Sequence, residues 1–164
     1  MVAENDVGEE TYSRPPAGED IKKICRSLNE NGVEYVLVGG LAMNFHGLAR
    51  MTHDIDLLID TSPENVSKVI DALSVLPDKA VRGVGLDDIQ KYTVVRIADE
   101  VVIDLIGKIG DVTTKNAKIQ EFQAEGVKVP VADIETMIKT KQGYRGKDKE
   151  DLAYLRMKKA ERKK

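Results

Sequence analysis

The segment Val36-Leu37-Val38-Gly39-Gly40 ends an apolar run at two glycines, and after thirteen intervening residues the chain continues as Asp54-Ile55-Asp56-Leu57-Leu58-Ile59. The first run is short and rich in β-branched residues, which predicts a buried strand preceded by a turn at Asn31-Gly32. The apolar residues that follow have helical spacing up to Gly47, a typical C-terminal stop. The two glycines therefore stand where a strand becomes a helix.

A glycine pair at this position suits phosphate binding. Without a Cβ at Gly39 and Gly40, the backbone can approach a triphosphate closely while the first N–H groups of the helix point at it. The alternative is an ordinary strand-to-helix turn with no ligand, and the glycines alone do not exclude it.

The aspartates of the second run add a reason to expect a ligand. Residues two apart in a strand share a face, so Asp54 and Asp56 project together while Ile55, Leu57 and Ile59 project into the buried layer. Two carboxylates on one face repel each other unless a cation or a proton offsets their charge, and Mg²⁺ is the usual partner beside phosphate.

A third carboxylate, Asp104, interrupts the apolar run of residues 101–106. Residues 92–97 form a similar run, and the connection at 98–100 predicts a β-hairpin between the two. Burying one carboxylate in such a run is costly without a partner. A strand end in contact with water is the alternative, but Asp54 and Asp56 as neighbours favour a metal site.

These motifs, in this order, resemble the DNA polymerase β-like nucleotidyltransferase superfamily. The resemblance rests on Val38-Gly39-Gly40, the segment from Arg50 to Asp56, and Asp104. Within the superfamily it is strongest to small proteins related to the AbiEii toxin of abortive-infection systems, because residues 129–135 and the charged segment 141–152 are similar to the helical tail of that group.

The resemblance implies roles for the glycines and the acids. Gly39 and Gly40 would hold the β- and γ-phosphates of an NTP, and Asp54 and Asp56 would bind Mg²⁺ or Mn²⁺. Asp104 would help to hold the catalytic metal or accept the proton of the attacking hydroxyl. One cation would neutralise the triphosphate while the other activates the nucleophile.

Four further residues belong to the same expected nucleotide site. Arg50 and Thr52 would brace the loop that aims the aspartates, and Lys141 and Arg145 match the family tail and would face the cleft. The chain departs from many active members of the superfamily at Gly40, where they have a serine that contacts phosphate.

Length and composition indicate one compact domain. A chain of 164 residues with 41% hydrophobic content can bury one core. We expect an α/β fold with a mixed, mostly antiparallel sheet: a disordered acidic leader at 1–18, a core at 19–131 and a basic helical tail at 132–164 packed on that core. Cys25 is the only cysteine, and no stretch has the length of a transmembrane span or the character of a signal peptide, which favours the cytoplasm.

Charge is distributed unevenly along the chain. Residues 1–20 hold six acids and one arginine, whereas residues 139–164 hold eleven basic and four acidic residues. The basic tail would suit an RNA acceptor or nucleotide phosphates, and a solvated helix with extended lysines is the alternative. His46 and His53 are expected to be structural, because a metal cluster of His and Cys ligands needs more than two His and one Cys so distant in sequence.

Two functions follow from the sequence. The first is a metal-dependent transferase that moves a nucleoside monophosphate from an NTP to an acceptor hydroxyl and releases pyrophosphate. Its acceptor is open among tRNA or other RNA, a protein and a small molecule. The second is a catalytically silent module that binds a nucleotide or a partner, such as a cognate antitoxin. No membrane partner is expected.

Overall fold

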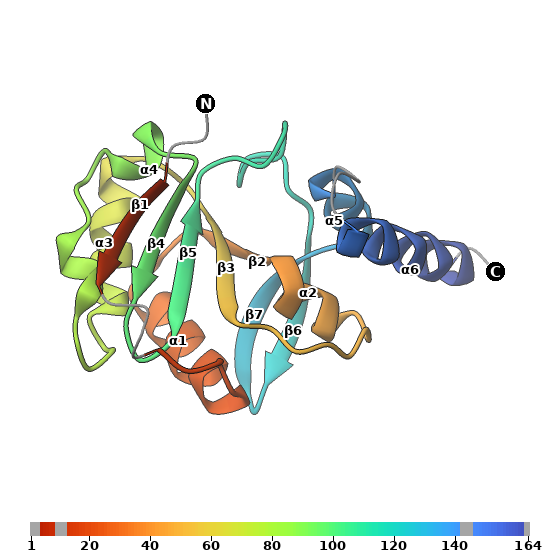
Figure 1. Cartoon of the computed structure of the whole chain (residues 1–164), viewed down its shortest axis with the longest axis horizontal. Helices are drawn as coiled ribbons and strands as arrows, with labels where there is room; N and C mark the ends of the chain where they lie inside the picture. The colour runs from red at the N-terminus through yellow and green to blue at the C-terminus, as the bar shows by residue number, and fades with distance from the viewer. Residues whose placement is uncertain (1–3, 9–12, 142–145, 163–164) are drawn as a thin grey trace.

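A seven-stranded mixed sheet in the order β1-β4-β5-β3-β2-β7-β6 forms the centre of the molecule (Figure 1). The computed structural model describes residues 4–8, 13–141 and 146–162. The strands are β1 (Glu4–Gly8), β2 (Tyr35–Val38), β3 (Asp54–Ile59), β4 (Val94–Ala98), β5 (Val102–Ile106), β6 (Ile119–Ala124) and β7 (Val127–Ala132).

The helices follow the strands in an irregular alternation. They are α1 (Gly18–Glu30), α2 (Gly39–Phe45), α3 (Pro63–Leu73), the short 3-10 helix η2 (Ala80–Gly83), α4 (Asp88–Lys91), α5 (Ile134–Thr140) and α6 (Gly146–Arg162). Ser62 caps α3 by accepting a hydrogen bond from the backbone N–H of Asn65. Within the described ranges, no helix is both long and apolar enough to cross a lipid bilayer.

The sheet is mixed, as the sequence predicts. Antiparallel ladders join β2 to β3, β4 to β5 and β6 to β7, whereas parallel ladders join β1 to β4, β3 to β5 and β2 to β7. The predicted hairpin β4–β5 is confirmed, and β6 and β7 form a second hairpin. The parallel pair β3–β5 is decisive for the site, because it places two acidic strands side by side.

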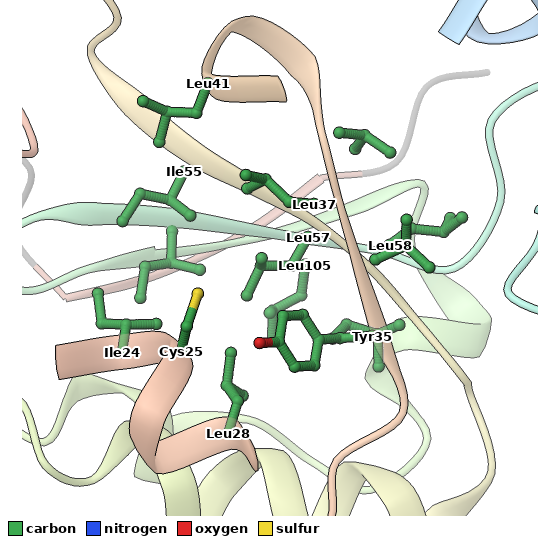
Figure 2. Close-up of a cluster of buried hydrophobic side chains, with 14 of the residues drawn as sticks. Ile24, Cys25, Leu28, Tyr35, Leu37, Leu41, Ile55, Leu57, Leu58 and Leu105 are labelled. Carbon is green, nitrogen blue, oxygen red and sulfur yellow. The ribbon is translucent and has the colours of Figure 1, made fainter. Parts of the chain in front are cut away.

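The core lies between the central strands and α1. Figure 2 shows Ile24, Cys25 and Leu28 of α1 directed toward side chains of the strands, including Leu57 and Leu105. All five side chains are buried, with Leu57 and Leu105 fully inaccessible to solvent. The apolar positions of β3 and β5 therefore anchor both strands from one face and leave their alternate positions to the opposite face.

The C-terminal helices are attached to the rest of the chain by specific polar contacts. The Tyr154 hydroxyl of α6 donates a hydrogen bond of 2.8 Å to the carbonyl of His46, which follows α2. The His46 ring is buried and donates from Nε2 to the carbonyl of Ala132 at 2.8 Å, in agreement with its expected structural role. Burial lowers the pKa of His46, which keeps the ring neutral.

The N-terminal segment differs from the disordered leader that the sequence predicts for residues 1–18. Residues 4–8 form β1, which extends the sheet in parallel with β4. Arg14 then donates to both carboxylate oxygens of Asp20, at 2.7 and 2.8 Å, and pairs with Glu100. A backbone ladder needs no apolar periodicity in the added strand, so composition did not reveal β1. Residues 1–3 and 9–12 lie outside the described residues.

Replacing Leu57 with alanine tests the importance of the central strand. Because Leu57 is fully buried, Leu57→Ala should lower the free energy of unfolding by about 2 to 5 kcal/mol. Leu86, which is 49% exposed, provides the matched control, and Leu86→Ala should change it by less than about 0.5 kcal/mol. Urea unfolding curves measure both, and equal losses would contradict this account of the core.

Candidate active site

One row of residues crosses four neighbouring strands of the sheet. In the strand registers, Val38 of β2 pairs with Asp56 of β3, Asp56 with Asp104 of β5, and Asp104 with Arg96 of β4. Asp54 lies two residues before Asp56 on the same face of β3. The sheet register alone therefore gathers three carboxylates and one guanidinium.

The three carboxylates are close enough to share a cation. One oxygen from each of Asp54, Asp56 and Asp104 lies within 4.8 Å of the others, which confirms the convergence that the sequence predicts. Burial, together with the charges of Asp54 and Asp104, raises the pKa of Asp56 to about 8. Burial and the charge of Asp104 also raise the pKa of Asp54, against the lowering effect of Arg96. Ionising all three acids together is therefore unfavourable in the absence of a bound cation.

A divalent metal fits these residues. Carboxylate oxygens are the preferred ligands of Mg²⁺ and Mn²⁺, and a bound cation would favour the ionised form of Asp56, which burial and the neighbouring acids disfavour. The three acids of the cluster provide oxygen ligands only, which excludes the sulfur and nitrogen coordination typical of structural zinc.

Arg96 is the positive member of the row. Its Nε donates to Asp104 Oδ1 at 2.9 Å and its terminal nitrogen to Asp104 Oδ2 at 3.0 Å, a bidentate pair. The same terminal nitrogen donates to Asp54 Oδ2 at 3.3 Å. Arg96 therefore bridges two of the three acids from the adjacent strand.

The glycine turn fits tightly against the acids and the next loop. Gly39 begins α2 with φ of +73°, and a Cβ added there would lie 2.0 Å from Asp56 Oδ2. A Cβ at Gly40 would lie 2.6 Å from Thr52 Cγ2, so Thr52 occupies the space into which a side chain at position 40 would project. The turn thus needs glycine for its backbone angle at one position and for close packing at both.

A cleft of about 430 Å³ lies over this arrangement. Its walls combine the glycine turn, the acids and the basic residues Arg50, Lys141 and Lys147. We call it the central cleft; it is lined by Gly39, Gly40, Arg50, Met51, Thr52, His53, Asp54, Asp56, Val94, Arg96, Asp104, Ile106, Lys141, Lys147 and Asp151.

Asp151 of α6 holds two of these basic residues in place. Its carboxylate pairs with Arg50 through Oδ1 and with Lys141 through Oδ2, the latter at 2.9 Å. The Asp151 side chain is 1% exposed and that of Lys141 is 9% exposed. Because both cations lower the pKa of Asp151, the carboxylate stays ionised despite its burial.

The structure brings together most of the site residues that the sequence predicts. Gly39, Gly40, Asp54, Asp56, Asp104, Arg50, Thr52 and Lys141 all line the central cleft. Arg145 lies outside the described residues. Sequence reasoning missed Arg96 and Asp151. The signal for Arg96 was its position between Val95 and Ile97, which are buried on the other face, but only the hairpin register places it opposite Asp104.

Comparisons with known proteins identify the family of the chain. A family model described as nucleotidyl transferase of unknown function (DUF2204) matches residues 17–164. A search of curated proteins finds no match.

Solved structures with a similar fold have low sequence identity to the chain. An antigenic nucleotidyltransferase-like protein from Paracoccidioides brasiliensis is 14% identical with a TM-score of 0.55, covering 84% of this chain and 74% of its own. A candidate nucleotidyltransferase from Thermotoga maritima is 16% identical with a TM-score of 0.50, covering 88% and 86%. At these identities the likeness concerns the fold.

The raised pKa of Asp56 predicts how stability depends on pH. Between its ordinary value of 3.8 and about 8, the folded protein keeps a proton on Asp56 that the unfolded chain releases. The free energy of unfolding should therefore fall as pH rises through this range, by up to about 1.4 kcal/mol per pH unit from this group. Asp56→Asn removes that contribution, so the variant should gain stability relative to the wild type as pH rises.

Urea unfolding at pH 5, 6, 7 and 8 measures this difference. The exposed Asp71 of α3 lies outside the central cleft, and Asp71→Asn serves as the matched control for the loss of one carboxylate outside the acidic cluster. A difference between wild type and Asp56→Asn that does not change with pH would contradict the raised pKa.

Proposed function

Because the chain belongs to the family of nucleotidyl transferases of unknown function (DUF2204), we propose that it transfers a nucleoside monophosphate from an NTP to an acceptor hydroxyl and releases pyrophosphate. The observation that supports this most is the cluster of three carboxylates within 4.8 Å beside a glycine turn. Nucleotidyl transfer requires this combination, since the reaction needs both a phosphate cradle and a place for divalent cations.

In this proposal Asp54, Asp56 and Asp104 hold Mg²⁺ or Mn²⁺. The bound metal supplies charge neutralisation for the triphosphate and a lower pKa for the acceptor hydroxyl. The protein contributes the position of the ligands: β3 and β5 fix the three carboxylates through their backbone ladder, before any substrate arrives.

The glycine turn and the basic wall of the central cleft bind the triphosphate. The first backbone N–H groups of α2, at Gly39 and Gly40, have no side-chain cap and remain available to phosphate oxygens. Arg50 and Lys141 add positive charge, and Asp151 limits their movement. Thr52 closes the turn from the side of the loop. Asp104 helps to hold the metal or accepts the proton of the acceptor hydroxyl.

The space around the acids suits two substrates. A second pocket of about 320 Å³ adjoins the central cleft and shares Gly39, Asp56 and Lys141 with it. Its other walls include the apolar residues Val38 and Ile109. A transferase has to hold its NTP and its acceptor at once, and two pockets that meet at Asp56 provide that room.

Transfer assays with the purified chain test the proposal. Incubation with each labelled NTP, Mg²⁺ and cellular RNA, cellular protein or small-molecule acceptors should label one acceptor class. Asp104→Asn should retain most NTP binding, because the glycine turn and the other two acids remain, while transfer falls by orders of magnitude. Single-turnover assays and nucleotide titrations measure the two effects.

The outcomes distinguish the enzyme from a silent module. Wild-type protein that binds NTP but labels none of the acceptors would support a nucleotide-binding module, such as one half of a toxin–antitoxin pair. Unchanged transfer by Asp104→Asn would show that its assigned role is wrong.

The glycine turn allows a second test that separates phosphate binding from stability. Gly39→Ala should weaken NTP binding at least tenfold, because the added Cβ would meet Asp56 Oδ2 at 2.0 Å and a strained φ must relax. Gly32 has a similar φ of +68° with nothing within 4 Å of an added Cβ, so Gly32→Ala is a matched control. Gly32→Ala should lose about 1 kcal/mol of stability from the strained φ alone, and Gly39→Ala should lose more, because the contact with Asp56 adds to the same strain.

Isothermal titration with Mg²⁺ and NTP measures this binding. The control should bind NTP as the wild type does. Equal affinity of Gly39→Ala and the wild type would remove the turn from the phosphate site.

A further inference from the structure

The guanidinium of Arg96 lies against two of the three acids of the cluster. It donates to both oxygens of Asp104 and to one oxygen of Asp54, at 2.9, 3.0 and 3.3 Å. The side chain of Asp104 is 8% exposed and that of Arg96 is 33% exposed, so the pair is shielded from water on the side of Asp104. Shielding strengthens the pair relative to an exposed one.

The contacts of Arg96 overlap with those that a metal would make. A cation shared by the three acids takes oxygens of Asp54 and Asp104, and both already accept hydrogen bonds from Arg96. A guanidinium and a divalent cation bound to the same carboxylates would also repel each other. Metal binding must therefore work against an ion pair that the protein itself supplies.

We propose that Arg96 is an internal cation of the active site, which competes with the divalent metal for Asp54 and Asp104 and so makes metal binding depend on the nucleotide. The inference rests on the proposed function, because it concerns the same acids. In the absence of NTP, Arg96 compensates part of the charge of the cluster, and metal binds weakly. The site is thereby protected from taking up a metal without its substrate.

Nucleotide changes this balance. A triphosphate adds negative charge to the central cleft, and phosphate oxygens are good bidentate partners for a guanidinium. Arg96 displaced by metal then has another anionic partner within the cleft that it lines. Metal and nucleotide should consequently bind more tightly together than either binds alone.

Replacing Arg96 tests this competition through metal binding, without any turnover. The probe is Mn²⁺ alone, titrated into the full chain and followed by electron paramagnetic resonance. Arg96→Met should bind Mn²⁺ about tenfold more tightly than the wild type. Arg96→Lys, which keeps the charge but loses the fork, should show a smaller gain. Arg82 is exposed on η2 outside the central cleft, and Arg82→Met should leave the Mn²⁺ affinity unchanged.

A second measurement uses nucleotide. The Mn²⁺ titration is repeated with a non-hydrolysable analogue of each NTP, and the gain in Mn²⁺ affinity is compared between variants. This gain should be several-fold larger in the wild type than in Arg96→Met, since only the wild type has an internal cation to displace.

Opposite results overturn the inference. If Arg96→Met binds Mn²⁺ as weakly as the wild type or more weakly, Arg96 supports the acids instead of competing for them. If that variant does not fold, as judged by circular dichroism, Arg96→Lys decides: an affinity no higher than that of the wild type overturns the competition.

Asp56→Asn distinguishes a failure of the Arg96 inference from a failure of the proposed metal site. Saturable Mn²⁺ binding that Asp56→Asn abolishes keeps the metal site even when the Arg96 inference fails. No saturable binding by any variant, with or without nucleotide, would refute the metal-dependent function and the competition together.

Discussion

Repulsion between three carboxylates in one row of a sheet is the constraint around which this structure is organised. Asp54, Asp56 and Asp104 cannot all stay ionised at such short separations without a positive partner. Their position is imposed by backbone ladders, so the carboxylates cannot relax apart as they would on a loop. The positive charge near the acids comes from Arg96 of β4 and from Lys141 and Lys147 of the C-terminal segment, which line the same cleft.

Buried apolar side chains on the other face of the same strands stabilise this arrangement. Ile55, Leu57 and Leu105 alternate with the acids and are completely or almost completely buried against α1 and its neighbours. Their burial stabilises β3 and β5 by several kcal/mol, which opposes the cost of the acidic cluster on the opposite face. Apolar packing and functional charge thus share two strands and are separated by the alternation of the pleat.

The C-terminal helix contributes to the site although it lies far along the chain from the acids. Asp151 of α6 binds Arg50, from the loop before β3, and Lys141, from the end of α5. One buried carboxylate thereby fixes two cations on one wall of the central cleft. This explains why a tail that looks in sequence like a charged, solvated helix includes buried acids.

Much of the fold and of the site could be predicted from local sequence. The apolar run before Gly39, the alternation around Asp54 and Asp56 and the β4–β5 hairpin all follow from periodicity and turn residues, and these are local properties of the chain. The strand β1 was missed because its pairing with β4 depends on backbone hydrogen bonds that leave no pattern in composition.

What the sequence by itself determined is therefore the set of acids, the glycine turn and the strands that hold them, because side-chain alternation and backbone freedom are encoded within a few residues. Only the tertiary structure decided which charged side chains pair with one another in and around that site. Arg96 lies opposite Asp104 through strand register, and Asp151 reaches Arg50 across 101 positions of sequence. Such long-range electrostatic partners depend on how distant elements pack, and no local pattern specifies that packing.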